Sequence, residues 1–177
     1  MEVLHLISIA SALFIFWLFA QAGAHKLNPA NDSYYTSLVV DYGWASQLTA
    51  IIIIKSVGIF ELGIALAILF PPTRPMIALI AAGLLFVYLL NMAFQLYQGR
   101  RDLDCGCSGP GAELKISGHL LLRNFLMMMI ALFCLVPTQN NGSGYWVLGA
   151  LLAMVGILVT LSSEQLISNA QKLQALR

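Results

Sequence analysis

The chain has 177 residues, of which 59% are hydrophobic and only 10% are charged. Soluble domains carry roughly a quarter charged residues, so this composition excludes an ordinary soluble domain and predicts an integral membrane protein in contact with the lipid bilayer. The formal net charge of +1 gives no general attraction for nucleic acid or for another acidic partner.

Five apolar stretches are candidates for helices that cross a bilayer, which takes about 20 residues. They cover residues 4–24, 45–70, 76–97, 116–136 and 145–161. We therefore predict an all-α fold, a polytopic transmembrane helical bundle with a four-helix core plus a C-terminal helix. No polar stretch is long enough to fold separately, so residues 1–177 are expected to form a single integral membrane domain.

The connections between these stretches differ in character. After the first span, residues 25–44 are polar and rich in tyrosine, which favours an interfacial segment with a short helix along the headgroups. Prolines at 71, 72 and 75 predict a tight break after the second span. A loop over residues 98–115 follows the third span, and residues 162–177 form a mildly amphipathic tail.

The loop at 98–115 carries the main chemical signal, because Cys105 and Cys107 are separated there by one glycine. Two cysteines at this spacing can close a strained disulfide, and Gly106 relaxes the backbone that this requires. A strained and exposed disulfide suits thiol exchange better than bracing a fold. Neighbouring charges would tune the pair, the arginines favouring thiolate and the acids opposing it: Arg100, Arg101, Asp102 and Asp104.

Three interpretations of the cysteine pair are open. The first is a thiol–disulfide oxidoreductase with Cys105 and Cys107 as its catalytic residues. The second is a non-catalytic membrane scaffold or chaperone, in which the cysteines are dispensable. The third is binding of a soft metal such as Cu(I) by two thiolates. Zinc is not expected, because the sequence offers no second ligand pair nearby.

Several polar residues lie within the predicted spans, where they are costly and therefore tend to pair or to serve function. Glu61 falls near the middle of the second span, and Asn91, Arg123 and Asn124 fall near the ends of their spans on the side of the cysteine loop. We predict that these four residues form a polar support beneath the loop. Lys55 could join them or reach the interface. Cys134, near the far end of its span, is predicted to be an inert buried thiol.

Five spans place the two ends of the chain on opposite faces of the membrane. Positive residues outside the spans gather on the face of the cysteine loop: Lys26, Arg100, Arg101, Lys115, Lys172 and Arg177. The other face has only Arg74. The positive-inside rule therefore predicts that the cysteine loop is cytoplasmic.

With these residues in place, the chain resembles the methylamine utilization MauE family of DoxX-like membrane proteins over nearly its whole length. The resemblance rests on the segment 25–27 that closes the first span, on Glu61, on Asn91, on the loop 99–110 with its Asp-Cys-Gly-Cys core, and on the Arg123-Asn124 pair. Position 108 is often aromatic in such proteins and is serine here.

The resemblance implies a multi-pass protein of the bacterial cell inner membrane. It implies an accessory role in methylamine metabolism, in which the protein assists maturation of the disulfide-rich small subunit of methylamine dehydrogenase beside a thioredoxin-like partner. That client is periplasmic, whereas the charge count predicts a cytoplasmic loop. If the loop is periplasmic, it oxidises or isomerises the client or its partner, with a quinone as electron acceptor. If it is cytoplasmic, electrons must be relayed across the bilayer.

Overall fold

The computed structural model describes residues 2–43, 45–100, 103–106, 109, 114–136 and 143–175. Its elements, in chain order, are α1 (Glu2–Leu27), the 3-10 turn η1 (Pro29–Asn31), α2 (Asp32–Asp41), α3 (Gln47–Ile68), α4 (Arg74–Tyr97), α5 (Gly118–Phe133) and α6 (Ser143–Ala175). The described residues contain no strand, only an isolated antiparallel bridge between Asp104 and Lys115. The predicted all-α fold is therefore confirmed.

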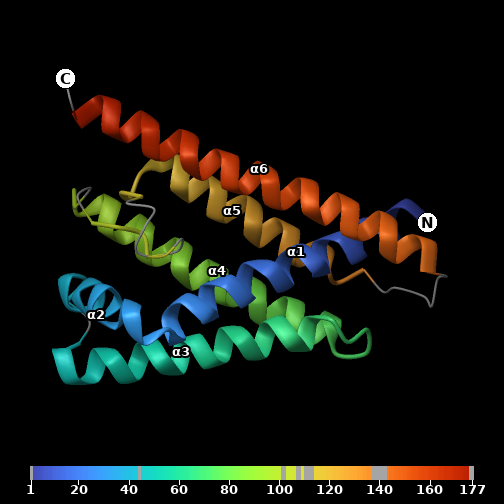
Figure 1. Cartoon of the computed structure of the whole chain (residues 1–177), viewed down its shortest axis with the longest axis horizontal. Helices are drawn as coiled ribbons and strands as arrows, with labels where there is room; N and C mark the ends of the chain where they lie inside the picture. Colours follow the sequence, from blue (N-terminus) through green and yellow to red (C-terminus); the bar gives the residue numbers. More distant parts are fainter. Residues whose placement is uncertain are drawn as a thin grey trace.

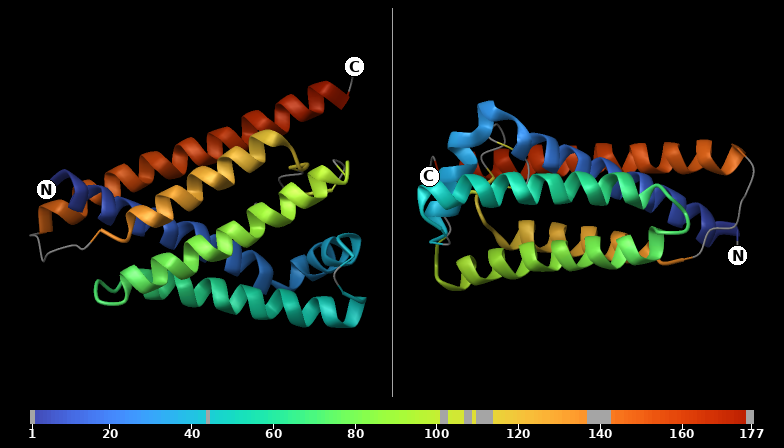
Figure 2. Two further views of the ribbon diagram at one scale, coloured as in Figure 1. Left: turned by 180° about the vertical axis from the view of Figure 1, so that it is seen from behind. Right: turned by 90° about the horizontal axis from the view of Figure 1, so that it is seen from below.

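Within the described part of the chain, four helices are long and apolar enough to cross a membrane, namely α1, α3, α4 and α6, and α5 is a shorter apolar helix of 16 residues (Figure 1). The protein is thus a multi-pass membrane protein. α1 packs against both α3 and α6, which lie on opposite sides of it, and α5 packs against α4 (Figures 1 and 2). α1 begins and α6 ends at opposite ends of the bundle (Figure 1).

The core lies among α1, α3, α4 and α5, where small residues let the helices approach closely. Alanines contribute much of its buried surface on α4: Ala78, Ala81 and Ala82. They face larger side chains of α1, including Phe19 and Ile15. Only 11% of the apolar window of α6 is buried, so most of its surface is available to lipid.

Two predicted boundaries need correction at the C-terminal end. The fifth span and the following tail are one continuous helix, α6, of 33 residues. The helix continues because residues 162–175 contain neither proline nor glycine, the residues that stop a helix most strongly. The fourth span also forms a shorter helix than the apolar stretch 116–136, since α5 begins at Gly118 and ends at Phe133.

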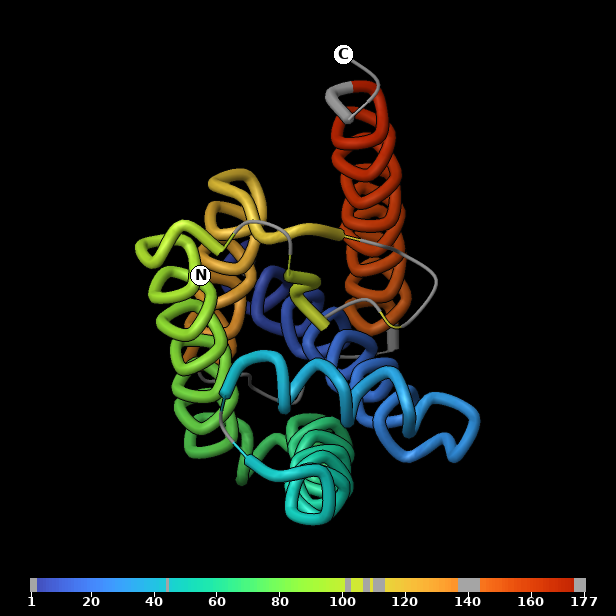
Figure 3. Tube along the Cα trace, turned by 90° about the vertical axis from the view of Figure 1, so that its left-hand side faces the viewer, coloured from blue at the N-terminus to red at the C-terminus, as the bar shows by residue number. Residues whose placement is uncertain are grey.

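The end of the bundle that carries the cysteine loop is closed by α2. This helix forms within the predicted tyrosine-rich segment, and it crosses the end of the bundle with residues 103–106 lying near the centre (Figure 3). Lys55 of α3 fixes the entry to this region. It donates to the carbonyl oxygens of Lys26 and Leu27 at 3.3 and 3.2 Å and forms an ion pair with Asp32. A cation at the last carbonyls of α1 complements that helix terminus.

Candidate functional site

The two ends of the cysteine loop are held together by a short ladder. Cys105 N–H donates to the Leu114 carbonyl and Ile116 N–H donates to the Leu103 carbonyl, both at 3.0 Å. The Tyr42 hydroxyl, at the end of α2, donates to the Asp104 carbonyl at 2.5 Å. These contacts give Cys105 a defined position at the end of the bundle.

The last turns of α6 hold the same ladder from outside. The side-chain amide of Gln171 accepts from the Lys115 N–H at 3.1 Å and donates to the Lys115 carbonyl at 2.9 Å. It pairs with this backbone as a neighbouring strand would. The C-terminal part of α6, predicted as a separate tail, is therefore a brace for the loop.

Glycine lets the loop approach the helices beneath it at two points. Gly106 has a φ of +67°, and a Cβ built on it would lie 3.1 Å from Leu38 Cδ2 of α2. Gly109 has a φ of +81°, and its Cβ would lie 3.2 Å from His25 Nδ1 of α1. Both backbone conformations favour glycine, so the loop is fitted closely onto α1 and α2.

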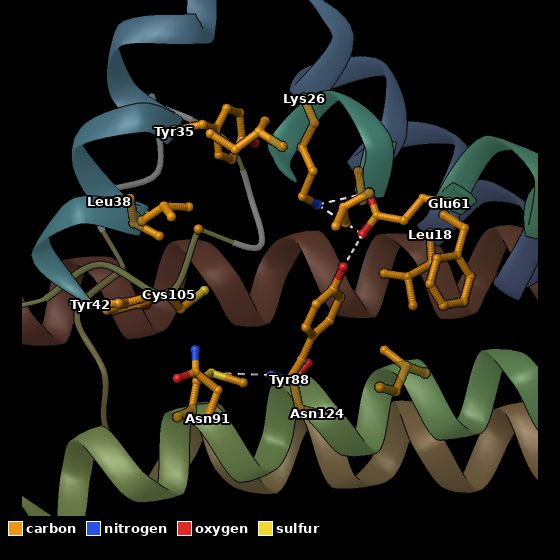
Figure 4. Close-up of a pocket in the computed structure, with 18 of the residues that line it drawn as sticks. Leu18, Lys26, Tyr35, Leu38, Tyr42, Glu61, Tyr88, Asn91, Cys105 and Asn124 are labelled. Atoms are coloured by element: carbon orange, nitrogen blue, oxygen red, sulfur yellow. Dashed lines mark hydrogen bonds and ion pairs between the residues drawn. The ribbon is translucent and has the colours of Figure 1, made fainter. Parts of the chain in front are cut away.

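Beneath the loop the bundle contains a partly open cavity of about 150 Å³. Cys105 and Gly106 lie at its loop end, and Figure 4 shows the Cys105 side chain pointing into it. Most of the wall is apolar, and these residues come from the five helices α1 to α5: Leu18, Phe19, Val39, Ile53, Ile54, Val57, Leu85, Met92 and Met127. Cys105 also packs against the buried cluster of Tyr42, Met92 and Ile116.

An ion pair with a hydroxyl partner stands on the wall of this cavity. Lys26 Nζ of α1 donates to both carboxylate oxygens of Glu61 of α3 at 2.8 Å, and the Tyr88 hydroxyl of α4 donates to Glu61 Oε1 at 2.7 Å (Figure 4). Glu61 has no exposed surface. A carboxylate at such depth needs a partner, and here two helices supply three hydrogen bonds.

Two glycines explain how Lys26 reaches Glu61. Gly23 lies one turn before Lys26, and Gly58 lies one turn before Glu61. A Cβ on Gly23 would lie only 2.8 Å from the Gly58 carbonyl oxygen, and one on Gly58 would lie 3.1 Å from Lys26 Cβ. The backbones of α1 and α3 therefore approach closely at this level, in the manner of small-residue contacts between membrane helices.

Two amides face the cavity from the opposite side. Asn91 of α4 points into it on the side of Cys105 and forms no hydrogen bond with another described residue (Figure 4). Asn124 of α5 is 3% exposed, and its Nδ2 donates to the sulfur of Met92 at 3.4 Å. A thioether is a weak acceptor. Both amides therefore retain hydrogen-bonding capacity toward the cavity.

Arg123 also lines the cavity, but its partner is on α6. Its Nη1 donates to Glu164 Oε1 at 2.5 Å, and both side chains are mostly buried. The buried Nε of Arg123 has no hydrogen-bond acceptor among the described residues. This ion pair ties α6, otherwise the least buried helix, to the core next to the cavity.

The structure thus brings Glu61, Asn91, Arg123 and Asn124 to one cavity below Cys105, although their functional role stays a prediction. Lys55 does not join them. Of the residues predicted to tune the thiols, Arg100 donates to the Asp41 carbonyl at 2.6 Å and so braces α4 against α2. Cys107, Arg101 and Asp102 lie outside the described residues. Cys134 is fully buried at the end of α5.

Sequence reasoning missed three partners: Lys26, Tyr88 and Glu164. Lys26 lies just beyond the predicted first span, Tyr88 lies inside an apolar stretch, and Glu164 lies in the predicted tail. The two charged partners could have been sought in the sequence, because Glu61 and Arg123 each need an opposite charge at a similar depth in the membrane.

These features define a class: an all-helical, multi-pass membrane protein with a cysteine-bearing loop over an internal cavity. The family described as methylamine utilisation protein MauE matches residues 3–137. This match covers most of the chain, which therefore belongs to the MauE family.

Individual relatives agree with this assignment. The methylamine utilization protein MauE of Paracoccus denitrificans is 28% identical over 123 residues, covering 70% of this chain and 65% of that protein. The protein of the same name from Methylophilus methylotrophus is 26% identical over 138 residues, covering 77% of this chain and 72% of the relative. The match therefore spans slightly less than two thirds of the Paracoccus denitrificans protein. No solved structure matches the chain.

Proposed function

We propose that this protein is a thiol–disulfide redox factor of the bacterial inner membrane that serves methylamine utilisation. Its client would be the disulfide-rich small subunit of methylamine dehydrogenase, reached directly or through a thioredoxin-like protein. The observation that carries the proposal is the position of Cys105. It lies on a braced loop at the end of the bundle, with Cys107 two positions further along the chain.

The exchange chemistry proceeds in two steps. A thiolate of the client attacks the Cys105–Cys107 disulfide, which forms a mixed disulfide and releases one thiolate of the pair. A second client thiolate then attacks the mixed disulfide, so the client leaves oxidised and the pair is left as two thiols. The client has lost two electrons, and the pair has gained them. The pair must then be reoxidised before another turnover.

The support for this role is geometric. Exchange requires a sulfur that a partner can reach and a backbone that tolerates both the joined and the separated state. Cys105 is partly exposed, and Gly106 occupies a left-handed conformation between the two cysteines. The ladder, Tyr42 and Gln171 hold the loop from its flanks, so that these changes stay local.

The test replaces each cysteine in a strain that grows on methylamine. We expect Cys105→Ser and Cys107→Ser each to abolish accumulation of the mature, correctly bonded small subunit, measured by mass spectrometry of its disulfides. Cys134→Ser is the matched control, because that thiol is buried away from the loop, and it should retain maturation. If both loop variants mature the client fully, the redox role is wrong and a non-catalytic scaffold is the better description.

A further inference from the structure

We infer that the cavity beneath Cys105 binds the headgroup of a lipid-soluble quinone, which reoxidises the cysteine pair. This inference rests on the proposed redox function and names its electron acceptor. It starts from the fact that the pair, after each exchange, holds two electrons that must go elsewhere. The acceptor must reach the sulfurs, and the cavity adjoins Cys105.

The cavity has room for one six-membered ring. The cavity measures about 150 Å³, and a cavity of that volume in another protein accommodates benzene. A single six-membered ring therefore fits. The mostly apolar wall favours such a ring over a hydrated ion.

The polar groups of the cavity match the two carbonyl oxygens of a quinone. The amides of Asn91 and Asn124 can donate hydrogen bonds to one carbonyl, since neither has a strong acceptor among the described residues. Across the cavity, Lys26 of α1 uses two of its three N–H groups on Glu61, which leaves the third for the other carbonyl. A quinone needs donors at both ends of its ring and apolar contact between them, and the cavity offers both.

The bilayer side of the cavity suits a ligand with a hydrocarbon tail. Ile53 of α3 lines the cavity and is 38% exposed on the bundle. Its neighbour one turn along, Val57, also lines the cavity. A tail leaving the ring past Ile53 would enter the lipid directly, so the ligand need not cross water to reach the site.

Quinone reduction takes up both the electrons and the protons that the cysteine pair releases. The sulfurs of Cys105 and Cys107 form one bond and release two electrons and two protons. The quinone takes up both electrons and both protons and leaves as quinol. Cys105 lies at the edge of the cavity, so the donor and the acceptor would lie side by side.

The test uses the purified full-length protein in detergent and a ubiquinone with a one-isoprene tail. We expect saturable binding to the Cys105→Ser, Cys107→Ser double variant, because the ring site does not include the sulfurs. Val57→Phe fills the cavity and should weaken binding about tenfold or more. Ile59→Phe adds the same ring on the same helix at a position 64% exposed to the outside, and it should bind as the parent does.

Asn124→Leu tests the same site independently of Val57→Phe, in case the larger side chain disturbs the fold. Asn124→Leu keeps the volume and removes the amide, and it should weaken binding about tenfold, whereas Asn169→Leu on the exposed surface of α6 should not. In addition, protein with both loop cysteines reduced should convert one equivalent of quinone to quinol, and Cys105→Ser should convert none. Thermal unfolding of every variant identifies those that remain folded.

The inference would be overturned by a lack of saturable quinone binding, by equal binding of Val57→Phe and Ile59→Phe, or by binding without quinol formation. Saturable binding of a saturated fatty acid in place of quinone would make the cavity a lipid site and also overturn it. These failures leave the maturation test of Cys105 and Cys107 standing. Conversely, dispensable cysteines would overturn the redox function and with it the reoxidation step, while intact quinone binding would leave the cavity assigned as a quinone site.

Discussion

Lys26 and Glu61 are 35 positions apart in the chain, yet they are joined across the α1–α3 contact by two hydrogen bonds of 2.8 Å. Glu61 is fully buried and the Lys26 side chain is 13% exposed. The pair fixes the register of α1 against α3 and forms part of the cavity wall. Several expectations depend on this relationship and on the contacts around it.

Removing one partner of this pair should destabilise the bundle strongly. Glu61→Gln leaves the Lys26 ammonium buried without its counter-charge, a change that costs about 3–5 kcal/mol in comparable pairs. Asp32→Asn breaks the more exposed Lys55–Asp32 pair and should cost about 1 kcal/mol or less. Thermal unfolding in detergent measures both. Lys26→Met combined with Glu61→Leu should recover much of the loss, and equal effects of Glu61→Gln and Asp32→Asn would refute this account.

The close approach of α1 and α3 predicts a steric effect at Gly23. In Gly23→Ala the new methyl group would lie 2.8 Å from the Gly58 carbonyl oxygen, so the helices must separate, at about 1–3 kcal/mol. Gly63→Ala is the matched control on α3, because nothing lies within 4 Å of its added methyl group. It should be neutral or stabilising, since alanine favours helix. If both variants unfold at the same temperature, the contact is not close.

The Gln171 brace predicts a change in thiol reactivity. Gln171→Ala removes two hydrogen bonds from Lys115, each contributing about 1 kcal/mol, so the ladder holding Cys105 should open more often. In a background with Cys107 and Cys134 replaced by serine, Cys105 should then react several-fold faster with a maleimide. Gln165→Ala alters an exposed amide of the same helix and should leave the rate unchanged. An unchanged rate in Gln171→Ala would mean that the brace does not control the loop.

Direct exchange with a periplasmic client predicts the side on which the loop lies. A maleimide that does not cross membranes should label Cys105 and Cys107 in cells whose outer membrane alone has been permeabilised. Labelling only after the inner membrane is opened would place the loop in the cytoplasm, as its positive charges predict, and would exclude direct exchange. A cysteine introduced near the start of α1, at the opposite end of the bundle (Figure 1), is the control and should show the opposite pattern.

The sequence predicted the helical scaffold well because its signals are local. Long apolar stretches separated by prolines defined α1, α3 and α4 to within a few residues, and the polar side chains at Glu61, Asn91 and Asn124 indicated where the interior would be. The end of a membrane span and the end of a helix are different properties, however. The polar residues after Leu161 predicted the end of the membrane span. The helix itself continues to Ala175, because the residues in between include no proline or glycine that would end it.

Partner choice could not be predicted from the sequence. Which cation meets Glu61 depends on the rotation of α1 against α3, and that rotation is set by the contact of Gly23 with Gly58. Likewise, Arg123 can pair with Glu164 only because α6 continues as a helix beyond the predicted end of its span, which places Glu164 beside α5. The cavity is a further product of packing, since it is the space left between the helices α1 to α6 and the loop.

α6 has one more consequence. At about 1.5 Å per residue, its 33 residues span about 50 Å, whereas the hydrocarbon layer of a bilayer is about 30 Å thick. A helix this long adjusts to thicker or thinner lipid by tilting. Near its C-terminal end, Gln171 is hydrogen-bonded to the backbone of Lys115. Acyl-chain length in the host membrane should therefore set the tension on the cysteine loop, which makes reconstitution in lipids of different thickness a direct way to vary it.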